Sequence, residues 1–110
     1  MIGDALAIEG PGCDFEGRVV EVLAGDRLRV MRDGRPVELR LWGVVCPEAG
    51  QPFAKAAREF TSGCALARMA KIRVVSHEET GRLCGCVTLE TGADLGKALV
   101  RAGLARSDAR

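Results

Sequence analysis

The stretch Arg27-Leu28-Arg29-Val30-Met31-Arg32-Asp33-Gly34-Arg35-Pro36-Val37-Glu38-Leu39-Arg40-Leu41-Trp42 decides the fold. Asp-Gly between two segments of alternating polar and apolar residues is a strong signal for a tight β-hairpin. Residues 27–31 and 37–42 are therefore predicted to be neighbouring strands. Their inward positions are Leu28, Val30, Val37, Leu39 and Leu41, and the outward positions of the second strand are Glu38, Arg40 and Trp42.

The rest of the chain supplies three more strands and two helices. Valine-rich residues 15–23 precede the hairpin and extend it to a three-stranded meander. Asp94 is a good N-cap for a second helix, and Gly103 is placed to end that helix as its C′ residue. The other predicted elements are a helix over 52–70, strands over 71–75 and 83–89, a polar loop over 76–82, and an irregular end over 105–110.

The order β-β-β-α-β-β-α predicts a five-stranded barrel of the OB-fold type with two helices. An open α+β sheet is the alternative, because periodicity alone does not separate the two. The length of 110 residues predicts one domain. We place it at residues 15–106, between an N-terminal arm (1–14) and a C-terminal tail (107–110).

Composition excludes several classes of protein. Apolar residues make up 47% and charged residues 28% of the chain, which excludes a disordered protein. No apolar run approaches the ~18–20 residues of a membrane span, so no membrane partner is expected. The start, Met1-Ile2-Gly3-Asp4, lacks the pattern of a signal peptide. As written the chain is expected to be cytoplasmic, and an exported mature fragment is left open.

The charges raise the question of which arginines recognise phosphate. Sixteen basic and 15 acidic residues give a net charge of +1, which argues against a broad polyelectrolyte-binding surface but not against one phosphate site. Thirteen of the basic residues are arginine, which binds phosphate in a bidentate manner. Codon usage in a GC-rich genome explains such a bias equally well, so only particular positions are informative.

Three charged residues stand at strand ends or constrained loops. Arg40 lies on the outward face of a predicted strand, Glu48 follows Pro47 in a loop, and Arg82 follows Gly81 at the start of a strand. Two arginines and a carboxylate that converge would form a phosphodiester-cleaving site, with the arginines neutralising the transition state and the carboxylate activating water. Solvated surface charge is the alternative that spacing alone leaves open.

Several segments form an ordered set of motifs along the chain. They are Gly25-Asp26, Val37-Glu38-Leu39-Arg40-Leu41 leading to Cys46-Pro47-Glu48, Gln51-Pro52-Phe53 before a helix, Gly81-Arg82-Leu83, and Asp94-Leu95 followed by Ala98-Leu99-Val100-Arg101-Ala102-Gly103-Leu104-Ala105. This set resembles the staphylococcal (micrococcal) nuclease family over about residues 15–106.

The resemblance implies a role for each matched residue. Arg40 would bind the scissile phosphate, and Arg82 would stabilise the transition state. Glu48 would act as the general base. Asp26 would be a carboxylate ligand of calcium, to which Cys46 would add its backbone carbonyl oxygen.

The departures from the family pattern concern the metal site. Ala24 stands where the family has a leading acid, and Val45 replaces the second carboxylate ligand. Since calcium affinity follows the number of hard oxygen ligands, we expect weak or absent calcium binding. Glu38 as a substitute ligand and Arg27 as a fixed positive charge in place of the metal are weaker alternatives.

Other candidate residues are open to two readings. Trp42 shares the outward face of Arg40, where it would either stack on a base or be partly buried against a helix. His77 is predicted to be a surface residue, with a phosphate contact as the alternative. The five cysteines (Cys13, Cys46, Cys64, Cys84 and Cys86) form no CxxC zinc pattern and are expected to be reduced structural thiols.

Two functions remain open. The first is a nuclease-type phosphodiesterase that acts on single-stranded DNA or RNA, with weakened or absent calcium dependence. The second is a catalytically inactive module that binds nucleic acid or protein. Retention of Arg40, Arg82 and Glu48 favours the enzyme, and loss of the acids at Ala24 and Val45 favours the module.

Overall fold

The computed structural model describes residues 13–108, so the predicted N-terminal arm lies outside the described residues except for Cys13 and Asp14. This part of the chain contains seven strands and two helices. In chain order they are β2 (Phe15–Ala24), β3 (Arg27–Arg32), β4 (Arg35–Leu41), β5 (Val44–Val45), α1 (Ala54–Ala65), β6 (Met69–His77), β7 (Leu83–Thr88), α2 (Leu95–Arg101) and β8 (Arg106–Ser107).

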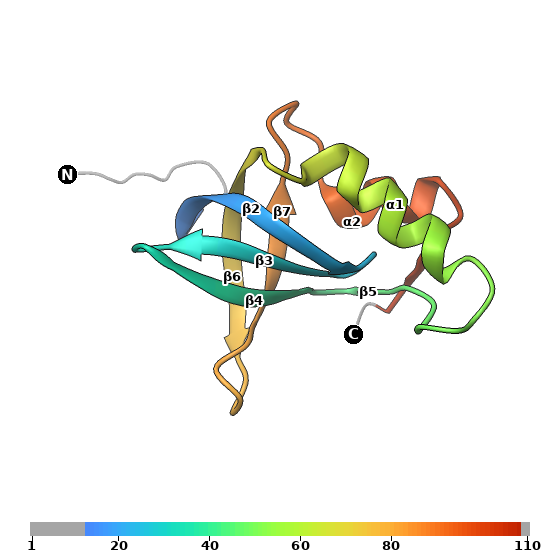
Figure 1. Ribbon diagram of the computed structural model, residues 1–110, viewed down its shortest axis with the longest axis horizontal. Coiled ribbons are helices and arrows are strands. Elements are labelled where there is room, and N and C mark those ends of the chain that lie inside the picture. Colours follow the sequence, from blue (N-terminus) through green and yellow to red (C-terminus); the bar gives the residue numbers. More distant parts are fainter. Residues whose placement is uncertain (1–12, 109–110) are drawn as a thin grey trace.

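Five strands form a closed barrel in the order β2-β3-β4-β7-β6, with β6 paired back to β2 (Figure 1). The β4–β7 pair is parallel, and the other four pairs are antiparallel. This is the order of an OB-fold barrel. The predicted fold is therefore confirmed, and the alternative of an open sheet is wrong.

Two local features allow the barrel to close. Asp33 and Gly34 both have positive φ angles, 52° and 80°, as a tight type I′ hairpin requires, and Arg32 pairs with Arg35 across this turn. Strand β2 has two register irregularities, at Val19/Glu21 and Val22/Ala24. Bulges bend a strand, and β2 is thus able to pair with β3 over one part and with β6 over another.

Alternating apolar side chains fill the barrel, as the sequence predicts. Leu28, Leu39 and Leu41 are at most 1% exposed, whereas their neighbours Arg40 and Trp42 face outward. The buried core also includes Val19, Val30, Val44, Cys46, Ala57, Ala65, Ala70, Ile72, Leu83, Val87, Leu89, Leu95 and Leu99.

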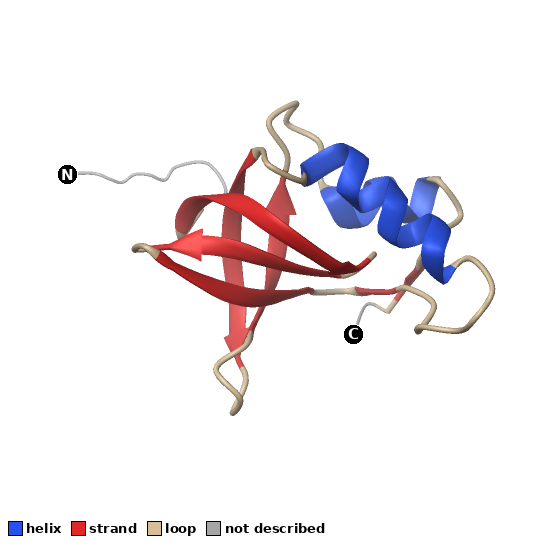
Figure 2. Cartoon of the chain, in the orientation of Figure 1, coloured by secondary structure: helices blue, strands red, loops and turns tan. Residues whose placement is uncertain are grey.

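Both helices of the described chain lie at one end of the barrel (Figure 2). The predicted caps of α2 are confirmed: the Asp94 side chain accepts a hydrogen bond from the Lys97 backbone N–H at 2.9 Å. Gly103 has a φ of 76°, and the backbone N–H of Leu104 returns to the Leu99 carbonyl at 3.0 Å. No helix in the described chain is long and apolar enough to cross a bilayer.

Helix α1 is shorter than predicted at both ends. It begins after Phe53, which has a left-handed φ of 69°, and ends at Ala65 rather than near residue 70. The Ala67 backbone N–H donates to the Val19 carbonyl at 2.8 Å, and the Arg18 guanidinium donates to the Ala67 carbonyl at 2.6 Å. These contacts with β2 turn the chain out of the helix and into β6, which local propensity does not reveal.

Two strands extend into segments that were predicted to be irregular. Arg106–Ser107 form β8, which pairs with β5 in a separate two-stranded sheet. His77 is the exposed last residue of β6 and pairs with Leu83, rather than lying in the following loop. β8 depends on pairing with β5, which is far away in the sequence, whereas the end of β6 depends on pairing with β7 across the following turn.

Candidate active site

Parallel pairing of β4 and β7 brings Arg40 and Arg82 into one region. Arg40 pairs with Cys84 in the β4–β7 ladder, and Arg82 immediately precedes β7. The loop before Arg82 is tight: the Glu78 backbone N–H donates to the Arg82 carbonyl at 2.8 Å, and Gly81 has a φ of 88°. Glycine adopts this conformation without the steric cost of a side chain.

One carboxylate joins the two arginines. Glu78 Oε2 accepts a hydrogen bond from Arg40 Nη2 at 3.0 Å, and Glu78 Oε1 accepts one from Arg82 Nε at 2.7 Å. Arg82 Nη1 also donates to Glu38 Oε2 at 3.2 Å. We call these four residues the arginine–glutamate cluster.

The side chains of this cluster remain accessible to a ligand. Their exposed fractions are 38% for Arg40, 23% for Glu78, 27% for Arg82 and 29% for Glu38. Beside them lies a cleft of about 430 Å³, to which Glu38, Gly81 and Arg82 contribute. The two guanidinium and two carboxylate charges sum to zero, so an anion must compete with a resident carboxylate for the arginines.

Hydrogen bonding shifts two pKa values in the cluster. The Arg82 and Arg40 guanidinium groups, acting first by hydrogen bonding, lower the pKa of Glu78 below its ordinary value. The Glu78 and Glu38 carboxylates likewise raise the pKa of Arg82. Glu78 and Arg82 are therefore both ionised at neutral pH.

Glu48 stands apart from the cluster. Its backbone N–H donates to the side-chain oxygen of Gln51 at 2.7 Å, and its carbonyl accepts the Gln51 backbone N–H at 2.9 Å. The Glu48 side chain is exposed, and within residues 13–108 it makes no ion pair with Arg40 or Arg82. The predicted general base is thus held in a short turn without contacting the arginines in this state.

Asp26 lies next to Cys46. Its carboxylate accepts the Cys46 backbone N–H at 3.3 Å, and its own carbonyl accepts the Leu41 N–H at 2.9 Å. Burial, followed by the negative charge of Asp26, raises the pKa of the Cys46 thiol to about 12. The thiol is therefore protonated and is not a ligand for a hard cation.

The described residues around Asp26 offer few carboxylates to a calcium ion. Calcium takes six to eight oxygen ligands, and tight sites use several carboxylates. Val45 supplies none, and Glu38 is engaged by Arg82. Among the described residues no group of three or more His, Cys, Asp or Glu side chains is arranged to hold a metal ion. The carbonyl ligand expected from Cys46 stays a prediction.

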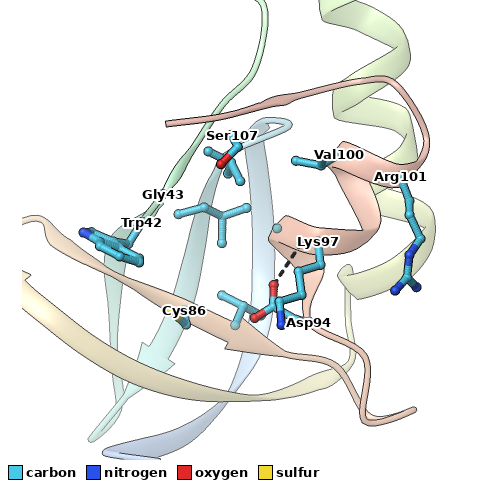
Figure 3. Close-up of a pocket in the computed structure, with 12 residues that line it drawn as sticks. Trp42, Gly43, Cys86, Asp94, Lys97, Val100, Arg101 and Ser107 are labelled. Atoms are coloured by element: carbon cyan, nitrogen blue, oxygen red, sulfur yellow. Dashed lines mark hydrogen bonds between the residues drawn. The ribbon is translucent and has the colours of Figure 1, made fainter. Parts of the chain in front are cut away.

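Three other predicted features have defined positions. Arg27 lies opposite Arg40 in the β3–β4 ladder, so it adds positive charge to the Arg40 face. Trp42 is 45% exposed and is one of the residues that line a cleft beside α2 (Figure 3). Its contact with nucleic acid stays a prediction. All five cysteines have free thiols.

Glu78 is the site residue that the sequence prediction missed. It lies in the segment that was predicted to be a polar loop, where an acid is ordinarily solvated. The available signal was its position four residues before Arg82 with Gly81 between them, because a tight turn brings such side chains together.

The closed five-stranded barrel with two helices defines a small protein of the OB-fold class. Comparison with known proteins is more specific. The family described as "Staphylococcal nuclease homologue" matches residues 38–110, and the chain belongs to this family.

Individual relatives carry names of the same kind. An "Uncharacterized endonuclease" of Escherichia coli O157:H7 is 29% identical over 92 residues, which cover 84% of this chain and 60% of that protein. "Protein ParB" of Escherichia coli is 30% identical over 83 residues, 74% of this chain and 47% of that protein. "Micrococcal nuclease" of Shigella flexneri is 30% identical over 74 residues, 67% of this chain and 42% of that protein. The chain thus spans about half of these relatives.

Proposed function

We propose that this protein hydrolyses phosphodiester bonds of DNA or RNA at the arginine–glutamate cluster. The observation that carries the proposal is the convergence of Arg40 and Arg82 on one carboxylate, at 3.0 and 2.7 Å. The two oxygens of the Glu78 carboxylate each accept a hydrogen bond from one guanidinium group. The two non-bridging oxygens of a phosphodiester are likewise bonded to one central atom. The names of the relatives support a nucleic acid as the substrate.

The reaction assigned to these residues needs a displacement and a proton transfer. The substrate phosphate displaces Glu78 from at least one guanidinium, and the arginines then stabilise the charge that develops on phosphorus-bound oxygen. Glu48 takes a proton from water as the water oxygen bonds to phosphorus and the bond to the leaving oxygen breaks, and the leaving oxygen takes a proton from solvent. Glu48 makes no ion pair with either arginine here, and its role requires that the attacking water lie within hydrogen-bond reach of its carboxylate.

A cleavage assay on single-stranded DNA and RNA, with and without calcium, tests the proposal. Arg40→Ala should lower kcat by about 100-fold, and Glu48→Gln by about 100-fold or more. Arg35→Ala is the matched control, because Arg35 is an exposed arginine of the same strand outside the cluster. Unchanged activity in both site variants would remove the catalytic assignment.

A second candidate function is binding of nucleic acid without cleavage. The observation in its favour is the neutral charge of the arginine–glutamate cluster together with a single carboxylate at Asp26. Wild-type protein that binds an oligonucleotide in an Arg40-dependent way, but leaves it intact with and without calcium, would support this function over hydrolysis.

A further inference from the structure

Arg27 is the exposed first residue of β3 and lies beside the arginine–glutamate cluster without being part of it (Figure 1). We infer that Arg27 is a third phosphate-binding residue of the candidate site, and the inference rests on the proposed function. Its guanidinium binds the same substrate phosphate as Arg40.

The strand register places Arg27 and Arg40 on the same face of the barrel. The two residues are direct partners in the antiparallel β3–β4 pair, and side chains directly opposite each other project from one face. The Leu41 backbone N–H donates to the Asp26 carbonyl at 2.9 Å, so the hydrogen bonds fall on the residues next to the Arg27–Arg40 pair. Side chains approach each other more closely at such a non-hydrogen-bonded pair, and one phosphate is therefore within reach of both guanidinium groups.

Arg27 differs from the other two arginines in its charge balance. Within residues 13–108, Arg40 and Arg82 each form ion pairs with glutamates, whereas Arg27 forms none. Its partner on β2 is Ala24, which has no charge, and the adjacent Asp26 carboxylate accepts the backbone N–H that follows β5. Since the charges of the cluster sum to zero, Arg27 gives the region around Arg40 a net positive charge.

Two arginines directly opposite each other are unfavourable for the strand pair. Like charges in this arrangement repel, whereas opposite charges stabilise a pair. Two residues further along β3, Arg29 lies opposite the acid Glu38. This pairing of opposite charges is interrupted at Arg27 and Arg40, and an anion bound between the two guanidinium groups would remove their repulsion.

Arg27 gives the incoming phosphate a guanidinium that it can bind without displacing a carboxylate. Arg40 and Arg82, by contrast, both donate hydrogen bonds to Glu78. Phosphate held by Arg27 lies next to Arg40 and competes there with Glu78 for the second guanidinium. Arginine suits this role because it binds phosphate through two parallel hydrogen bonds as well as by charge.

Calorimetry with inorganic phosphate tests the role of Arg27. We expect Arg27→Ala to weaken phosphate binding about tenfold, because one charge-assisted contact is lost. Arg27→Lys should weaken it less, since lysine keeps the charge but not the planar fork. Arg35→Ala is the matched control and should bind as wild type does, because Arg35 also lies opposite an arginine, Arg32, but at the other end of the same strand pair.

Urea denaturation separates binding from folding. Arg27→Ala should leave the urea midpoint unchanged or raise it, because the substitution removes the repulsion between like charges. Weaker phosphate binding together with a lowered midpoint would show that Arg27 only supports the structure around Arg40, and it would overturn the inference.

A double variant tests whether the two arginines hold one phosphate. Arg27→Ala combined with Arg40→Ala should weaken phosphate binding by less than the product of the two single effects, because residues that share a ligand are coupled. Single effects that multiply would mean that Arg27 acts independently of Arg40, and they would overturn the inference.

Failure of this inference is distinguishable from failure of the proposed function. In cleavage of a single-stranded oligonucleotide, Arg27→Ala should lower kcat/KM about tenfold, in step with phosphate binding. Binding and cleavage that require Arg40 but are unchanged in Arg27→Ala overturn the role of Arg27 alone. Wild-type protein that binds no phosphate and leaves oligonucleotides intact overturns both proposals.

Discussion

At the scale of single residues, Glu78 determines the charge that a substrate meets. Two like-charged guanidinium groups are held side by side because one carboxylate accepts a hydrogen bond from each. The arginines could be picked out as candidates, because Arg40 lies on the outward face of an alternating strand and Arg82 follows Gly81 just before another strand. The Glu78 contact could not, since it depends on the β6–β7 turn and on parallel pairing with β4.

Replacing Glu78 should therefore free the arginines. We expect Glu78→Gln to bind inorganic phosphate several-fold more tightly than wild type at neutral pH, because a neutral amide competes less with an anion. Isothermal titration calorimetry with phosphate measures this change. Glu79→Gln is the control, since Glu79 is an exposed neighbour outside the cluster. Weaker phosphate binding in Glu78→Gln would show instead that the carboxylate is needed to align the guanidinium groups.

The titration of Glu78 provides a second prediction at this scale. Its pKa is lowered from the ordinary 4.5, first by the Arg82 hydrogen bond and then by that of Arg40. A lowered pKa in the folded protein means that the ionised group stabilises the fold above its unfolded pKa. That contribution is lost as the pH falls through the folded pKa.

Side-chain carboxyl NMR measures this pKa. Arg82→Ala should raise the Glu78 pKa towards its ordinary value, and Arg35→Ala should leave it unchanged. A Glu78 resonance that titrates identically in wild type and Arg82→Ala would contradict the ion pair.

At the scale of elements, a buried hydrogen bond and close packing hold the turn between β2 and β3 against α1. The Thr61 hydroxyl donates to the Gly25 carbonyl at 2.7 Å, and Thr61 is fully buried. A Cβ on Gly25 would lie 2.8 Å from both the Ala57 Cβ and the Cys46 Sγ. Gly25 is thus required by the close approach of α1, and this contact places its neighbour Asp26.

Two glycine substitutions test this packing. Gly25→Ala should lower the free energy of unfolding by about 1–3 kcal/mol, because Ala57 and Cys46 must move. Gly63→Ala is the matched control: Gly63 is exposed within α1, a Cβ added there would meet no atom within 4 Å, and alanine should stabilise the helix by about 1 kcal/mol. Urea denaturation measures both. Equal small effects would contradict the tight contact at Gly25.

Whether an element could be predicted depends on how far apart in the sequence the residues lie that determine it. The β3–β4 hairpin and the caps of α2 were correct because their signals are local. The end of α1 and the existence of β8 were not predictable, because each is set by backbone hydrogen bonds to residues far away in the sequence.

At the scale of the whole molecule, β8 adds a positive charge near the candidate metal site at Asp26 and Cys46. Val45 pairs with Arg106 across the β5–β8 sheet, and both line a cleft that includes Cys46. A carboxylate introduced at position 45 would therefore meet a positive charge from the C-terminal strand.

Calcium binding by engineered variants tests this arrangement. Val45→Asp should strengthen calcium binding by adding a second carboxylate, and Val45→Asp combined with Arg106→Ala should strengthen it further. Val45→Asn is the control, because it has a similar shape without the charge. Calorimetry that shows no gain in either carboxylate variant would mean that the cleft near Asp26 cannot accommodate the ion.

The parallel β4–β7 pair gives the candidate site a kinetic signature. The β2–β3–β4 meander contains Arg40 and forms from contacts that are near in sequence, whereas pairing with β7 closes a long loop of chain and is intrinsically slow. A refolding intermediate that holds only the meander would lack Arg82 and Glu78. Phosphate binding during refolding would therefore appear together with β4–β7 pairing, and its rate would report the rate of that pairing.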